Sequence, residues 1–428
     1  MLEPSGLEVW QFSNNLRVIY QPLPTQVVVG DVWIRAGSAL ENDRCGVAHL
    51  LEHMIFKGTP RLAPGMFDRL IEDQGGVTNA ATSYDYTHFF VATGRDQFQP
   101  CLDALAHILL EASLCPVELE GERQVVLAEI NQVLDNPSAV SWQLFNEQLY
   151  PNHPYGRSVL GTPEQVQDHS NQDLQRFHRA HYQPDNVTIV IAGGIEKSQC
   201  LDHVQRAFER FPSPPSPLDL ALNPALALFI PSEPLTPATQ GMGTKPQRSE
   251  LELPFLDQTT LMLGWPTPAI DRLWDVCGLE ILSVVLTGGR GSRLVQILRE
   301  QRGVVQDVDS SLELRKVASR FTITACLDQP YGPMVEALIL HELKRLCQEP
   351  ISDREVERAK RLLLNDMTFS LETPLQVASI YGFYTILQDP YIPLQYPRQI
   401  QKLTPRDLQD IAQRYFTEDY VVTIARPS

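Results

Sequence analysis

The 428-residue chain reads as two versions of one sequence, and this internal repeat restricts its possible folds more than any other feature. Near the end of the first half, a helical segment at residues 172–175 leads into the strand-like run HYQPDNVTIVIAGG. Residues 406–409 lead in the same way into YFTEDYVVTIARP near the end of the second half. Residues 71–77 and 298–304 also correspond, and each precedes an apolar strand, THFFVAT or SRFTITA. We therefore expect a duplicated domain.

A proline-rich stretch separates the two halves. Nine prolines lie between residues 211 and 250, interrupted by the short apolar run ALALFI. Such proline density is typical of an extended connection between domains. The sequence therefore predicts an N-terminal domain over residues 1–213, a linker over 214–250 and a C-terminal domain over 251–428.

Both halves carry the patterns of strands and of helices. The runs TQVVVGDVWIRAG, NVTIVIAGG and TTLMLGW are rich in β-branched residues and are bounded by Gly, Pro or Asn, as strands are. The runs PVELEGERQVVLAEINQVL and PMVEALILHELKRL place apolar residues three and four positions apart, which predicts helices that pack on a sheet by one face. We expect an α+β fold in each half, a sheet covered by helices.

The charge and hydropathy of the chain exclude some classes of partner. Its 52 acidic and 35 basic side chains give a formal net charge of -17, which repels nucleic acid and anionic membranes. No run approaches the roughly 18 apolar residues that a membrane-spanning helix needs. The first twenty residues lack the pattern of a signal or transit peptide, so we expect a cytoplasmic protein without a membrane span.

The seven cysteines are widely spaced and include no CxxC pair. Spacing therefore offers neither a thiolate metal site nor a redox motif. We expect them to be reduced and mostly buried small residues.

The segment GVAHLLEHMIF, at residues 46–56, carries the candidate chemistry. It contains no helix breaker after its glycine, so it predicts a helix on which His49 and His53 lie one turn apart on the same face. Two imidazoles placed in this way can reach one zinc ion at about 2.0–2.1 Å. Glu52 lies close to the same face but is offset, so it can meet a water on the metal rather than the metal itself.

A catalytic zinc centre needs one more protein ligand, and spacing alone does not identify it. Many acidic residues follow in the first half, among which Glu122 and Glu129 lie two turns apart on one face of a predicted helix. A solvated acidic stripe would give the same pattern. Two ordinary histidines beside a surface glutamate would likewise give the same HxxEH string. The residue pattern leaves these alternatives open.

Six strings occur in the order GVAHLLEHMIFKGT, GGVTNAATSYDYTHFF, ERQVVLAEI, HPYGRSVLGT, YQPDNVTIVIAGG and GGRGSRLVQILREQRG. Over nearly the whole chain they resemble the pitrilysin-like inverted zinc peptidases, which include the catalytic subunit of mitochondrial processing peptidase and related bacterial enzymes. The resemblance implies two homologous domains, each a mostly antiparallel sheet layered with helices. Together the two domains would form half of a clamshell chamber.

The resemblance also implies a Zn²⁺ centre with a role for each residue. His49, His53 and Glu129 would bind the metal. Glu52 would be the general base, and Glu122 a second carboxylate that orients a ligand or supports the catalytic water.

Substrate binding and partners are implied in the same way. Asn79 and Ala80 match an edge strand that pairs with the backbone of a substrate, and Arg299 matches a substrate-gripping arginine of the second domain. In many active relatives a tyrosine follows this arginine after seven residues, but this chain has Gln306 there. We therefore hypothesise a heterodimer in which a homologous zinc-free subunit supplies an Arg/Tyr pair. A homodimer is the alternative.

The expected function is that of a zinc-dependent endopeptidase that cuts unfolded peptides or targeting sequences inside a dimeric chamber. The alternative is a non-catalytic scaffold subunit of a larger complex. The complete set of ligands and base favours the peptidase. The second half has no HxxEH near Cys277 and Glu280, the place that corresponds to the motif, so we expect it to bind no zinc.

Overall fold

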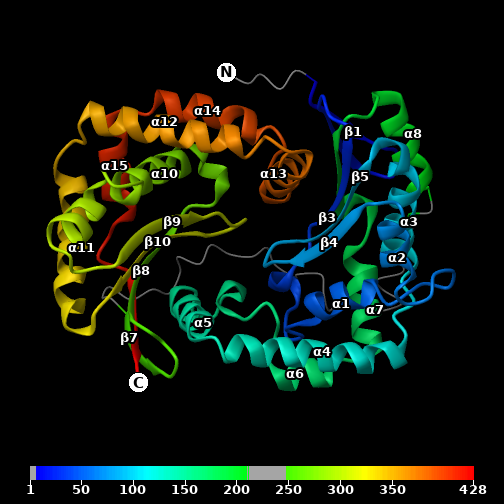
Figure 1. Ribbon diagram of the computed structural model, residues 1–428, viewed down its shortest axis with the longest axis horizontal. Coiled ribbons are helices and arrows are strands. Elements are labelled where there is room, and N and C mark those ends of the chain that lie inside the picture. The colour runs from blue at the N-terminus through cyan, green and yellow to red at the C-terminus, as the bar shows by residue number, and fades with distance from the viewer. Residues whose placement is uncertain (1–5, 210, 212–246) are drawn as a thin grey trace. The chain divides into compact units, whose positions relative to one another are not determined.

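The computed structural model describes residues 6–209, 211 and 247–428, which group into two compact units (Figure 1). Of the described residues, unit 1 comprises 6–131, 157–209, 211 and 370–393. Unit 2 comprises the described residues 132–156, 247–369 and 394–428. Each unit therefore contains one segment from the opposite half of the sequence.

The predicted domain ranges, 1–213 and 251–428, are contiguous and do not include this exchange of segments. Helix and strand periodicity reports only local structure, so it could not reveal that the two units exchange segments. The predicted linker, 214–250, lies outside the described residues except for 247–250, which begin strand β7 (Gln247–Leu253). The strands of the second half thus start before the predicted end of the linker, and the rest of the division stays a prediction.

A six-stranded sheet forms the centre of unit 1. Its strand order is β1-β2-β6-β3-β5-β4, and only β2 and β6 run parallel. The central strand β3 is buried on both faces, with Val28 and Val32 in one apolar core and Val29 and Trp33 in another. The strands are β1 (Glu8–Gln11), β2 (Arg17–Pro22), β3 (Val27–Ile34), β4 (Val77–Thr82), β5 (Thr87–Gly94) and β6 (Val187–Gly193).

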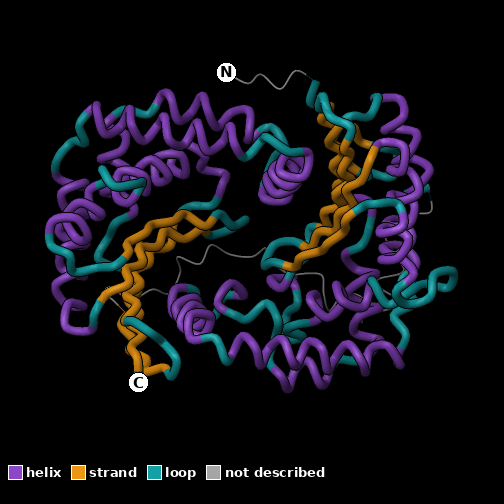
Figure 2. The backbone as a smooth tube through the Cα atoms, in the orientation of Figure 1, coloured by secondary structure: helices purple, strands orange, loops and turns teal. Residues whose placement is uncertain are grey.

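Helices cover both faces of this sheet (Figures 1 and 2). Helices α1 and α3 supply much of the larger core, whereas α13 packs on the opposite face, against Val29 and Trp33. Helix α4 begins in unit 1 and ends in unit 2. The helices are α1 (Val47–Ile55), α2 (Met66–Asp73), α3 (Phe98–Glu111), α4 (Pro116–Leu134), α6 (Pro163–Asp168), α7 (Asn171–His181), α8 (Lys197–Ala207) and α13 (Pro374–Leu387), with the short 3-10 helices η1 (Ser38–Leu40), η2 (Arg95–Gln97) and η4 (Pro184–Asn186).

Unit 2 repeats this design with a five-stranded sheet. Its order is β7-β11-β8-β10-β9, and only β7 and β11 run parallel. If β1 is set aside, the two sheets have the same strand order and one parallel pair each. The predicted duplication and the mostly antiparallel α+β fold are confirmed. The remaining strands are β8 (Thr259–Thr267), β9 (Asp307–Glu313), β10 (Ser319–Leu327) and β11 (Val421–Pro427).

Helices also cover the sheet of unit 2. The two helices predicted from periodicity form α4 and α11, and these predictions are confirmed. The helices are α5 (Pro137–Leu149), α10 (Leu273–Thr287), α11 (Gly332–Gln348), α12 (Asp353–Phe369), α14 (Ile392–Lys402) and α15 (Pro405–Tyr415), with the π-helix η7 (Val295–Gln301) and the 3-10 helices η3 (Pro154–Gly156), η6 (Ile270–Arg272) and η8 (Gln329–Tyr331).

Two expectations from composition can be compared with the structure. All seven cysteines are free, and four of them are buried, at positions 45, 101, 200 and 277. Among the described residues, no single helix is long and apolar enough to cross a membrane. The segments Arg95–Glu111 and Pro116–Leu134 pass that test only as a pair, and they are bent by 101° from one another.

Candidate metal centre

Helix α1 carries the HxxEH residues, and its N-terminus is fixed by close packing. The buried Glu41 carboxylate accepts hydrogen bonds from the backbone N–H groups of Gly46 and Ala48, at 2.9 and 2.8 Å. These two bonds satisfy free N–H donors at the start of the helix. Gly46 has a φ of 88°, and a Cβ there would lie 2.6 Å from the Leu160 carbonyl oxygen. Only glycine therefore fits this start of the helix.

The structure brings His49, His53 and Glu129 together. The Nε2 atoms of both imidazoles lie 3.7 Å from one Glu129 carboxylate oxygen. One donor atom from each residue lies within 4.8 Å of the other two, a spacing that can hold a metal ion. The histidines come from α1 and the glutamate from α4, so the third donor reaches the motif through tertiary packing.

The protonation of His49 suits a metal ligand. Burial, together with the neighbouring His53, lowers the pKa of His49 to about 4, so its imidazole is neutral near pH 7. Zinc binds neutral imidazole nitrogens and carboxylate oxygens. Among the described residues, the buried Nδ1 of His49 has no hydrogen-bond partner. Two imidazole nitrogens and one carboxylate form a donor set that fits zinc.

Glu122 lies directly behind His53. Its carboxylate is 3.2 Å from His53 Nδ1 and 2.7 Å from the Lys57 ammonium. A carboxylate on Nδ1 fixes the imidazole tautomer and leaves Nε2 free to bind a metal. The contact places Glu122 next to one predicted ligand, and its orienting role stays a prediction. Lys57 was not predicted, and it lies just after the end of α1.

Glu52 takes a separate place beside the cluster. Its carboxylate accepts a hydrogen bond of 2.6 Å from the Thr82 hydroxyl at the end of β4. Burial raises the pKa of Glu52, although Thr82 and His53 act in the opposite direction. A carboxylate with a raised pKa is better able to hold a proton in transit. No sequence pattern predicted Thr82, because its approach to Glu52 depends on how β4 packs against α1.

The predicted substrate residues Asn79 and Ala80 lie on β4, which is an edge strand of the unit 1 sheet. Among the described residues, β4 pairs only with β5. The Ala80 N–H donates to the Asn79 side-chain oxygen at 2.9 Å, in an exposed position. The edge of β4 beside Glu52 is therefore open to another strand.

The predicted residues of the second half belong to unit 2. Arg299, on η7, forms ion pairs with Glu300 at 3.1 Å and with Asp307 at 3.7 Å. Gln306 is exposed before β9, and its side chain bonds to Gln258. The role of Arg299 in substrate binding stays a prediction.

Comparison with known proteins identifies the family. The family model of insulinase (peptidase family M16) matches residues 17–163, and that of the peptidase M16 inactive domain matches residues 168–363. The chain belongs to the M16 peptidase family. The first match contains His49, His53 and Glu129 together with the neighbouring Glu52. The second match covers most of unit 2, where no HxxEH was found.

Relatives that resemble the whole chain are called zinc proteases. The zinc protease PqqE of Helicobacter pylori is 27% identical over 416 residues, which cover 96% of this chain and 90% of that protein. YmxG of Bacillus subtilis, an uncharacterized zinc protease, is 28% identical over 97% of each chain.

Solved structures share the fold. A protease from Helicobacter pylori has a TM-score of 0.86 at 24% identity, covering 98% of this chain and 99% of that chain. The peptidase M16 inactive domain from Pseudomonas fluorescens has a TM-score of 0.86 at 19% identity, covering 99% and 98%. The fold of the whole chain is therefore that of M16 peptidases.

Because His49 is buried, we expect the free energy of unfolding of the metal-free protein to fall in mild acid. Folding holds the pKa of His49 at about 4, whereas an unfolded histidine takes up its proton near about pH 6.5. Between these values the unfolded state binds more protons, so the metal-free protein loses stability as the pH falls through this window. Burial also lowers the pKa of His169 and His178, which add to the slope.

The measurement is urea unfolding of chelator-treated protein across this pH window, for wild type and for His49→Gln. The variant should show a shallower loss of unfolding free energy on acidification, because one buried histidine is gone. Equal slopes would mean that His49 takes up its proton at the same pH in both states.

Proposed function

We propose that this chain is a zinc-dependent endopeptidase that hydrolyses unfolded peptides. The proposal rests on one observation: the ligand atoms of His49, His53 and Glu129 lie within 4.8 Å of one another, close enough to hold one metal ion. A second carboxylate, Glu52, is held beside them by Thr82. M16 relatives called zinc proteases support zinc as the ion.

Each side chain of the site has a separate role in the proposed reaction. A zinc ion at the three donors would supply a water of lowered pKa and polarise the peptide carbonyl. Glu52 takes the proton of the attacking water and passes it to the leaving amine, for which its raised pKa suits it. Glu122 holds the His53 ring in one tautomer.

The open edge of β4 supports an extended substrate. A peptide strand that pairs there would replace the bond between the Ala80 N–H and the Asn79 side chain with a backbone bond. Backbone pairing of this kind accepts many sequences, provided that the peptide is unfolded. Thr82 lies on the same strand and contacts Glu52, so the pairing would place a peptide bond near the base.

The partner proposed from the sequence is a homologous zinc-free subunit, with both chains in the cytoplasm. Gln306 stands where many active relatives have a tyrosine, so the partner would supply the Arg/Tyr pair. The competing function, a scaffold without catalysis, has less support because the donors, the base and its threonine contact are all retained.

Glu52→Gln tests the proposed base. The amide cannot take the proton, so kcat on a quenched unstructured peptide should fall by about 10²- to 10⁴-fold. Zinc content should stay at the wild-type level, because Glu52 is not a ligand, whereas His49→Gln should lose zinc. Glu72→Gln, which removes an exposed carboxylate of α2, is the matched control. Wild type without zinc would refute the metal centre, and full cleavage by Glu52→Gln would refute the base.

The partner hypothesis predicts weak cleavage by the isolated chain. Activity should rise when copurifying homologous subunits are retained, because the missing tyrosine is then supplied. Gln306→Tyr should recover part of that rise in the isolated chain, whereas Gln306→Phe, which lacks the hydroxyl, should not. A purified homodimer as active as the complex would contradict the heterodimer.

A further inference from the structure

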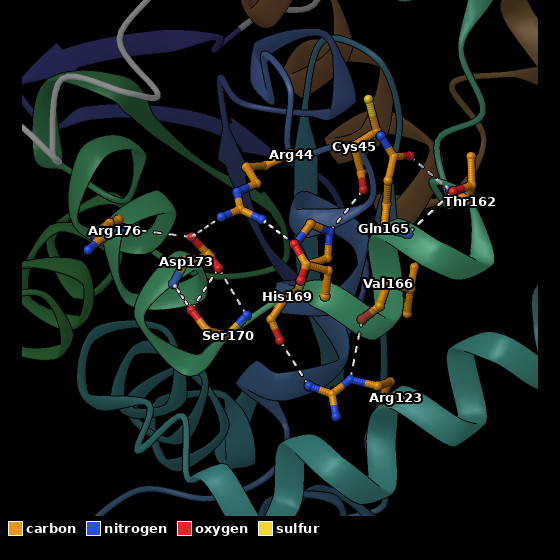
Figure 3. Close-up of polar contacts among 11 residues, drawn as sticks. Arg44, Cys45, Arg123, Thr162, Gln165, Val166, His169, Ser170, Asp173 and Arg176 are labelled. Carbon is orange, nitrogen blue, oxygen red and sulfur yellow. Dashed lines mark hydrogen bonds and ion pairs between the residues drawn. The ribbon is translucent and has the colours of Figure 1, made fainter.

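A short segment connects the two helices that carry the metal donors. Residues 166–170, at the end of α6 and the start of α7, contact both α4 and the residues just before α1 (Figure 3). We call this stretch the 166–170 segment. The reaction itself uses none of its side chains.

Arg123 makes the contact from α4. Its Nε donates to the Val166 carbonyl oxygen at 3.3 Å, and one terminal nitrogen donates to the His169 carbonyl oxygen at 2.9 Å. The planar fork of a guanidinium can serve two carbonyls at once, which a single ammonium cannot do in the same geometry. Arg123 directly follows Glu122, the carboxylate that holds His53.

His169 and Arg44 make the contact toward α1. The Nε2 atom of His169 lies 2.9 Å from the carbonyl oxygen of Cys45, the residue before the N-cap of α1. A carbonyl only accepts, so this nitrogen donates. Arg44 forms ion pairs with Asp168 at 2.9 Å and with Asp173 at 3.7 Å. His169 is 1% exposed, which keeps water away from its bond.

We propose that Arg123 and His169 are positioning residues of the metal centre, which set the distance between α4 and the start of α1. The zinc site of the proposed function is the premise of this inference. Of the 19 residues of α4 only Leu119, Glu122, Val126 and Ile130 are buried, so apolar packing alone holds the helix weakly. Glu129 meets the two histidines only at one spacing of the helices. Metal ligands tolerate small displacements poorly.

A residue that only stabilised the fold would lower stability and leave the metal geometry unchanged. The test therefore uses Arg123→Lys, His169→Phe and the double variant, with Co²⁺ replacing zinc as a spectroscopic probe. The visible spectrum of Co²⁺ reports the arrangement of its ligands. Zinc affinity is measured by competition with a chelator, and the unfolding of the metal-free proteins is followed in parallel.

Each single variant should bind zinc about tenfold more weakly than wild type and should change the Co²⁺ spectrum. The double variant should lose less than the sum of the two, because both residues act through the 166–170 segment. Arg293→Lys is the matched control: it weakens the 2.7 Å pair with Glu355 in unit 2 and should leave zinc affinity and spectrum unchanged.

Folded variants with wild-type affinity and spectrum would overturn the inference, as would an equal loss in Arg293→Lys. If His169→Phe does not fold, Arg123→Lys decides alone, because it keeps the charge and most of the side chain. A wild-type protein that binds neither ion would refute the proposed function itself, and the inference with it.

Discussion

The approach of Glu129 to His49 and His53 is the interaction on which the proposed chemistry of unit 1 depends. Helix α1 presents two imidazoles on one face because its other face is fully buried through Leu50 and Leu51. The carboxylate comes from α4, far along the chain. Its position is therefore set by the packing of two helices and by the side chains between them, and not by the motif.

The two units carry different residues at the corresponding place of one fold. Helix α10 follows β8 in unit 2 as α1 follows β3 in unit 1, and Cys277 and Glu280 stand on it. The Glu280 carboxylate accepts a hydrogen bond from the Tyr396 hydroxyl, and burial raises its pKa to about 7. A tyrosine thus satisfies a half-buried carboxylate in unit 2, whereas in unit 1 Thr82 holds Glu52 beside a cluster that can hold a metal ion.

Sequence patterns predicted the features that depend on neighbouring residues alone. The spacing of His49 and His53 fixed a shared helix face, and periodicity located α4 and α11. Glu129 could be chosen only through the family resemblance, because several acidic residues fit the spacing. The contact of Thr82 with Glu52 could not be predicted, because it depends on the packing of β4 on α1. Sequence patterns also could not predict the exchange of residues 132–156 and 370–393 between the units, since this exchange depends on long-range packing.

X-ray absorption at the zinc edge tests the central assignment most directly. Protein purified without added metal should contain one zinc per chain, with nitrogen and oxygen neighbours at about 2.0–2.1 Å and the multiple scattering of two imidazoles. In Glu129→Gln this shell should change while the two imidazoles remain. Absence of zinc, a sulfur shell near about 2.3 Å, or an unchanged shell in Glu129→Gln would contradict the assignment.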